Sequence, residues 1–123
     1  MGAEDLERLQ GEWRVIGLEI DGGAIPPAMV AAARIRLNGD RFVSSGMGAD
    51  YEGVLSLDPA AEPKRFTLTF QAGPEAGRAN HGLYELEGDR WRFCLDMTGG
   101  PAPDGFATTP GSGRALQTLE RVA

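Results

Sequence analysis

The chain has 123 residues, of which 41% are hydrophobic, and it carries a formal net charge of −6 at pH 7. Its length is typical of one domain, and this apolar content excludes an intrinsically disordered chain. The acidic balance argues against nucleic acid or an anionic membrane as a partner, because both require a basic face on the protein. Cys94 is the only cysteine, so no internal disulfide can form. We therefore expect a single domain over residues 1–123.

The first ten residues, MGAEDLERLQ, lack the basic segment and the apolar core of a signal peptide. No apolar run approaches the roughly 20 residues that a membrane-spanning helix needs. These features predict a cytoplasmic protein without a membrane anchor. Within this segment, Glu4 to Leu9 combines acidic residues at its start with two leucines three positions apart. This pattern favours one short helical turn in front of the first strand.

A first strand is predicted from Gly11 to Ile20, where apolar residues alternate with polar ones. The apolar positions at its end are out of phase with Trp13 and Val15. A β-bulge between Arg14 and Gly17 is therefore expected, because one extra residue would turn both sets inward. Downstream, the alanine-rich segment from Pro27 to Ala33 predicts a short helix, since proline is tolerated in the first helical turn.

The rest of the chain alternates between strands and turn residues. Asn38-Gly39-Asp40 predicts a type I′ hairpin turn, and Glu87-Gly88-Asp89 predicts a second hairpin. The Gly- and Pro-rich segment from Thr98 to Gly113 is longer than ordinary connections, which indicates a functional loop or a crossing over an open end. About eight short strands at regular spacing predict an all-β fold. An antiparallel up-and-down barrel is favoured, with a β-sandwich as the alternative.

The triplet Gly11-Glu12-Trp13 at the start of the first strand resembles the Gly-x-Trp signature of lipocalins. With GLYELEGD at 82–89 and PGSG-x-x-L-x-x-L-x-R at 110–121, the chain is similar from Leu9 to Arg121 to an uncharacterised bacterial family of small lipocalin-like domains. The resemblance implies a barrel in which Trp13 plugs the closed end and packs against Arg121. It implies no activity, substrate or catalytic residue, because none is established for that family.

Motifs of catalysis are missing from the sequence, which holds no Gly-x-Ser-x-Gly elbow, no His-Glu-x-x-His motif and no phosphate-binding loop. The single histidine, His81, is predicted to face outward from its strand, and a protein zinc site needs more ligands than one histidine and one cysteine supply. We therefore expect no metal and no cofactor. A non-catalytic protein is favoured, and in the enzymatic alternative His81 or Tyr84 would transfer the proton.

The candidate binding site consists of side chains that share the inward parity of their strands and would line an apolar pocket on the order of a few hundred Å³. These residues are Tyr51, Leu55, Phe66, Leu68, Phe70, Tyr84, Trp91 and Phe93, with Phe106 as a gate on the long loop. Two functions stay open. The first is a module that binds a small apolar or amphipathic molecule in the barrel. The second is a structural or protein-interaction domain whose barrel is filled by its own side chains.

Overall fold

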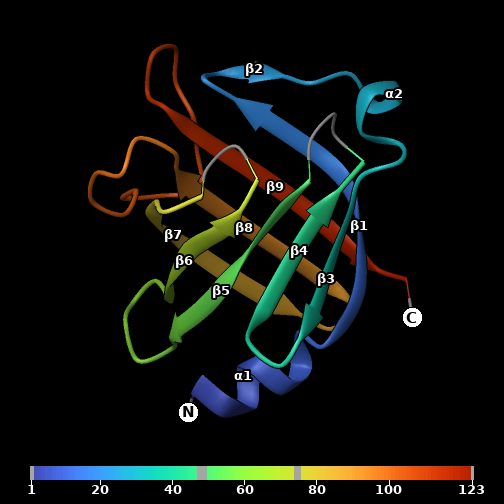
Figure 1. Cartoon of the computed structure of the whole chain (residues 1–123). Coiled ribbons are helices and arrows are strands. Elements are labelled where there is room, and N and C mark those ends of the chain that lie inside the picture. The colour runs from blue at the N-terminus through green and yellow to red at the C-terminus, as the bar shows by residue number, and fades with distance from the viewer. Residues whose placement is uncertain (1, 47–49, 74–75, 123) are drawn as a thin grey trace.

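Antiparallel strands form one sheet that curves until its first and last long strands pair (Figure 1). The computed structural model describes residues 2–46, 50–73 and 76–122. Within these ranges the strands are β1 (Gly11–Ile20), β2 (Gly23–Ala24), β3 (Arg34–Asn38), β4 (Arg41–Ser45), β5 (Tyr51–Asp58), β6 (Arg65–Ala72), β7 (Ala79–Glu87), β8 (Arg90–Asp96) and β9 (Arg114–Arg121). Apart from the two-residue β2, each strand pairs with the next one along the chain.

The pairing of β1 with β9 decides between the two predicted architectures. It runs from Trp13 opposite Arg121 to Ile20 opposite Ala115, so the sheet has no free edge between these strands. β1 and β3 to β9 therefore form a closed, antiparallel, up-and-down barrel of eight strands among the described residues, with β2 as an extra strand. The barrel prediction is confirmed, and the β-sandwich alternative is wrong.

The β-bulge predicted in β1 is present. The register against β9 shifts between Val15 and Gly17, and the residue between them, Ile16, is left exposed. Trp13 and Val15 are buried before the shift, while Leu18 and Ile20 line the barrel interior after it. The extra residue thus lets apolar positions of opposite parity point to the same side of the sheet.

The predicted hairpins form, but one turn type differs from the prediction. Asn38 pairs with Arg41, so the two central residues of the turn are Gly39 and Asp40 rather than Asn38 and Gly39. Only Gly39 takes a positive φ, 64°, whereas a type I′ turn needs positive φ at both central residues. That requirement is met at the β1–β2 turn, where Asp21 and the following glycine have φ of 51° and 82°.

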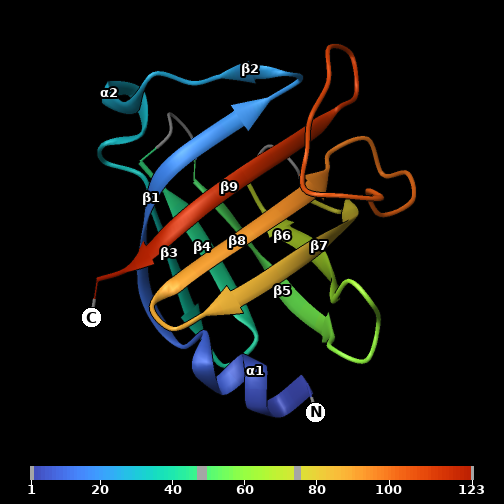
Figure 2. The ribbon, with the colours of Figure 1, turned by 180° about the vertical axis from the view of Figure 1, so that it is seen from behind.

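Two short helices lie at opposite ends of the barrel. α1 (Gly2–Arg8) crosses one end in both views (Figure 1, Figure 2). Gln10, just after it, exchanges two hydrogen bonds with the backbone of Gly39 in the β3–β4 turn. α2 (Pro27–Val30) lies near the other end, beside β1 (Figure 1). It is shorter than the predicted Pro27 to Ala33, because the chain turns after Val30 to enter β3.

The long connection between β8 and β9 folds against the outside of the barrel wall (Figure 2). The thiol of Cys94, which points away from the interior, lies 3.7 Å from the carbonyl oxygen of Ala107 on this connection. Further along, the Thr108 hydroxyl accepts a hydrogen bond from the backbone N–H of Gly22 in the β1–β2 turn. The connection therefore covers the outer face of β8 and is fixed to the rim by the β1–β2 turn.

Candidate functional site

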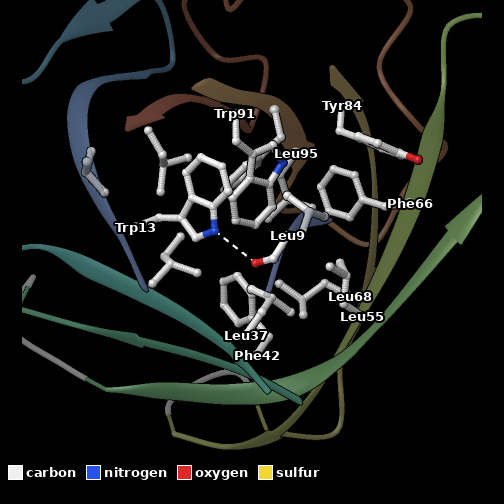
Figure 3. Packing of buried hydrophobic residues seen from close by; sticks show 14 of the residues in the cluster. Leu9, Trp13, Leu37, Phe42, Leu55, Phe66, Leu68, Tyr84, Trp91 and Leu95 are labelled. Atoms are coloured by element: carbon white, nitrogen blue, oxygen red, sulfur yellow. Dashed lines mark hydrogen bonds between the residues drawn. The ribbon is translucent and has the colours of Figure 1, made fainter. Parts of the chain in front are cut away.

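The half of the interior next to α1 is filled by aromatic rings. The Trp13 and Trp91 rings meet edge to face with centroids 5.6 Å apart, and Phe93 lies 5.2 Å from Trp91. Phe66 and Phe93 make a second edge-to-face pair at 5.6 Å. Such geometries add about 0.5–1.5 kcal/mol per pair to the burial of the rings. We call this region the closed half; Figure 3 shows its side chains packed around the two tryptophans.

Trp13 closes the end of the barrel. Its side chain is fully buried, and its indole N–H donates a 2.9 Å hydrogen bond to the carbonyl oxygen of Leu9 (Figure 3). The guanidinium of Arg121 lies 4.4 Å from the Trp13 ring centroid, in cation–π contact. The same guanidinium donates to the carbonyl oxygens of Gln10 and Arg8. Trp13 and Arg121 thereby join β1, β9 and the segment that follows α1.

A buried polar cluster holds α1 against this end. The Tyr84 hydroxyl donates a 2.7 Å hydrogen bond to Asp5 Oδ2, and Lys64 Nζ lies 3.0 Å from the same oxygen. Burial alone would raise the pKa of Asp5, but the hydrogen bonds from Tyr84 and Lys64 hold it below its ordinary value. The pKa of Tyr84 is raised, mainly by burial and to a smaller extent by the hydrogen bond to Asp5. Tyr84, predicted to line a binding pocket, therefore serves to attach α1.

The other half of the interior contains a cavity of about 160 Å³. We call it the open half, since it lies at the end of the barrel away from α1. Its wall is made by Leu18, Ile20, Phe42, Ser44, Tyr51, Leu68, Phe70, Asn80, Phe93, Leu95, Met97, Ala115 and Gln117. Tyr51 and Phe70 meet edge to face in this wall, with ring centroids 5.9 Å apart. The cavity is smaller than the predicted pocket because the rings of Trp13, Phe66, Tyr84 and Trp91 fill the closed half.

The structure divides the predicted interior residues into three groups. The cavity wall holds Tyr51, Leu68, Phe70 and Phe93, and the packed core away from the cavity holds Leu55, Phe66, Tyr84 and Trp91. Phe106, the predicted gate, lies outside the barrel. Its ring stacks on the guanidinium of Arg92 at 4.6 Å, and Arg92 points outward to pair with Glu85. The structure places the Phe106 ring on the outer wall and not at the cavity, a position that the sequence did not indicate because a loop without strand periodicity carries no signal for the face it covers.

Three amide or hydroxyl side chains in the cavity wall were missed by the sequence analysis. Ser44, Asn80 and Gln117 lie on β4, β7 and β9, respectively. Asn80 is two residues before Gly82, a position of predicted inward parity, so a polar residue on an inward-facing row was the available signal. Asn80 Oδ1 and Gln117 Oε1 are buried and have no hydrogen-bond partner among the described residues. No charged side chain belongs to the described wall of this cavity.

A separate groove of about 390 Å³ lies on the outer face. His81 and Thr67 face into it from β7 and β6, and Pro101 and Ala102 of the long connection form its rim. The imidazole Nδ1 of His81 lies 2.9 Å from the Thr67 hydroxyl oxygen. The outward direction predicted for His81 matches this position, and the contact with Thr67 gives the ring an ordinary hydrogen-bonded role on the surface.

Cys94 is buried beneath the long connection, and burial raises the pKa of its thiol. A raised thiol pKa disfavours the thiolate, so this cysteine is unsuited to nucleophilic chemistry near neutral pH. Across residues 2–46, 50–73 and 76–122, no group of three or more His, Cys, Asp or Glu side chains could hold a metal ion. Neither described helix is long and apolar enough to cross a membrane.

A scan against protein-family models gives no match, and searches of curated proteins and of solved structures give none either.

Proposed function

We propose that this protein is a non-catalytic binding module that holds one small, largely apolar molecule in the open half of its barrel. The observation that carries the proposal is the cavity of about 160 Å³, whose wall holds four aromatic rings, those of Phe42, Tyr51, Phe70 and Phe93. A concave, mostly apolar site with a few polar groups is the usual form of a small-molecule site.

The volume limits the size of the ligand. Drug-sized ligands occupy pockets of about 300–1,000 Å³, whereas an apolar cavity of roughly 150 Å³ is enough for benzene. A cavity of about 160 Å³ therefore suits a molecule with a single ring. A long acyl chain would require the packed rings of the closed half to move, at the cost of the contacts that close the barrel.

A cavity-filling series tests the proposal. Ala115 lies in the cavity wall on β9, between Leu95 of β8 and Ile20 of β1, so Ala115→Val and Ala115→Leu place added carbons into the space. Thr118→Val is the matched control, because Thr118 is on the same strand and faces the outer surface. Toluene is titrated into ¹⁵N-labelled protein, and chemical-shift changes are followed at the amides of the cavity wall.

The expected result is saturable binding of toluene to the unchanged protein and to Thr118→Val, weaker binding to Ala115→Val and none to Ala115→Leu. Circular dichroism checks that each variant is folded. Native mass spectrometry of protein purified from its own host should show a retained mass of one small molecule. Absence of toluene binding together with absence of a retained mass would contradict the proposal. That outcome would favour the alternative of a structural or protein-interaction domain without a ligand.

A further inference from the structure

We infer that the ligand of the open half is uncharged and carries an N–H or O–H group that donates a hydrogen bond to the amide oxygen of Asn80. This inference rests on the proposed function and names the chemical class that the cavity selects. It depends on the unpaired amide oxygens, on the absence of charge from the described wall, and on the volume of the cavity.

Asn80 is the most deeply buried polar residue of the cavity wall. It lies at the start of β7, opposite Leu68 of β6, and its side chain is 1% exposed. Its Oδ1 atom has no hydrogen-bond partner among the described residues. An unpaired acceptor in such a place costs about 1–3 kcal/mol of folding free energy. An apolar side chain would avoid that cost, so the amide is best explained by a donor that arrives with the ligand.

Gln117 supplies a second acceptor from another part of the wall. It lies on β9 opposite Phe93 of β8, and its Oε1 atom is also buried without a partner among the described residues. Because β8 separates β7 from β9, the amides of Asn80 and Gln117 enter the cavity from different strands. A third unpaired atom, Trp91 Nε1, belongs to a residue of the closed half and not to this wall.

The lack of charge in the described wall excludes charged ligands. A carboxylate or an ammonium group transferred from water into such a site would be left without a counter-charge, which is far more costly than burying a neutral hydroxyl. The acceptor oxygens would in addition repel a carboxylate. A neutral ring with a hydroxyl or amino group satisfies the amide, fits the volume of about 160 Å³ and leaves its apolar edge against the rings of Phe70 and Phe93.

The test compares four one-ring probes: phenol, which donates a hydrogen bond; anisole, which only accepts; toluene, which does neither; and benzoate, which is charged. Affinities are measured by calorimetry or by ¹⁵N chemical-shift titration for the unchanged protein, Asn80→Leu and Gln117→Met. Asn80→Leu keeps the branched shape of the side chain, Gln117→Met keeps a side chain of similar length, and both remove the amide oxygen. Thr118→Val is again the matched control, since it removes an outward-facing polar group from β9.

The expected result is that the ratio of phenol affinity to toluene affinity falls about three- to tenfold in Asn80→Leu, the range for one lost hydrogen bond. Gln117→Met should lower it less, and Thr118→Val should leave it unchanged. Benzoate should not bind measurably at neutral pH. Asn80→Leu should also resist urea better than the unchanged protein. If it does not fold, the ratio in Gln117→Met decides the question, and a fall there of at least twofold is then required.

Several results would overturn the inference. One is an unchanged ratio of phenol affinity to toluene affinity in both variants. Another is that Asn80→Leu weakens the binding of anisole and leaves the binding of phenol unchanged. A third is benzoate binding as tight as that of phenol. In each of these cases toluene would still bind the unchanged protein, so the proposed function would survive. Failure of every probe to bind would contradict both proposals at once.

Discussion

The two halves of the barrel interior are built from the same strands, but one half is closely packed and the other contains a cavity. In the closed half every ring is packed, and the Tyr84 hydroxyl and the Trp13 indole N–H both have partners, while Trp91 Nε1 is buried without one among the described residues. In the open half a cavity remains, and two amide oxygens lack partners among the described residues. β8 takes part in both, with Trp91 in the packed half and Leu95 in the cavity wall. Close packing and empty space are therefore separated along the barrel axis.

The comparison also shows where the protein can tolerate change. Interiors are close-packed, and the cost of a cavity depends on how well its surroundings can collapse. A truncation in the closed half creates a new void among rings that are already in contact. A truncation in the open half only enlarges an existing one. Two pairs of substitutions, with one member of each pair in each half, measure this difference.

The largest effect is expected from Trp13→Ala. It removes a fully buried ring together with the hydrogen bond to Leu9 and the contact with Arg121. We expect a loss of about 3–5 kcal/mol in the free energy of unfolding, measured by urea denaturation. Leu18→Ala, at the half-exposed mouth of the cavity, should cost less than half as much. Equal losses at the two positions would show that the halves are not energetically distinct.

An intermediate effect is expected from Tyr84→Phe, which leaves Asp5 paired with Lys64 and, at a longer distance, with Arg8. The expected loss is about 1–3 kcal/mol, because a buried hydrogen bond to a charged group is removed. Tyr51→Phe, in the open half, is the control and should change stability by no more than about 0.5 kcal/mol. Similar losses for both tyrosines would remove the distinction between an attachment residue and a cavity residue.

The same cluster predicts an acid-dependent component of stability. The pKa of Asp5 in the folded state lies below its ordinary value of 3.8. Its contribution is therefore fully present above pH 3.8 and is lost as the pH falls below that value, through the folded-state pKa. The free energy of unfolding, measured by urea titration between about pH 2 and pH 6, should therefore fall less steeply with acid in Asp5→Asn than in the unchanged protein. Part of the acid dependence should remain, because the pKa of Asp96 is also lowered: hydrogen bonds from Thr98 and Gly100 outweigh the effect of burial.

The smallest effect is expected from Phe106→Ala. Its ring contacts Arg92 on the outer wall, and a cation–π contact at an exposed site contributes about 0.5–1 kcal/mol. Toluene affinity should not change, in contrast to its loss in Ala115→Leu. A weaker toluene affinity in Phe106→Ala would mean that the long connection moves to cover the cavity, and would restore the gate that the sequence suggested.

The sequence predicted the fold well because strand parity is a local signal. Phe66, Leu68 and Phe70 alternate with outward threonines in β6, and the phase conflict between Trp13 and Leu18 is enough to require a bulge. The remaining space inside was not predictable in this way. The volume of this space depends on how side chains from all eight strands of the wall fit together. The sequence of any one strand does not determine that fit.

The residues with unpaired oxygens could have been found more readily than the cavity itself. Asn80 and Gln117 both occupy inward positions, and a polar residue on an inward-facing row departs from the pattern of a filled barrel. Phe106 could not have been placed, because the connection that carries it has no periodicity and its packing is set by contacts with Arg92 and β8.

The bulge at Ile16 makes β1 behave as two short strands of opposite phase joined end to end. Trp13 and Val15 belong to the first, and Leu18 and Ile20 to the second. Residues that secure the closed end and residues that line the cavity are thus independently variable within one ten-residue strand. A related barrel could change the shape of its cavity by substitutions after the bulge without disturbing the tryptophan before it, whereas deletion of Ile16 would force one of the two sets to face solvent.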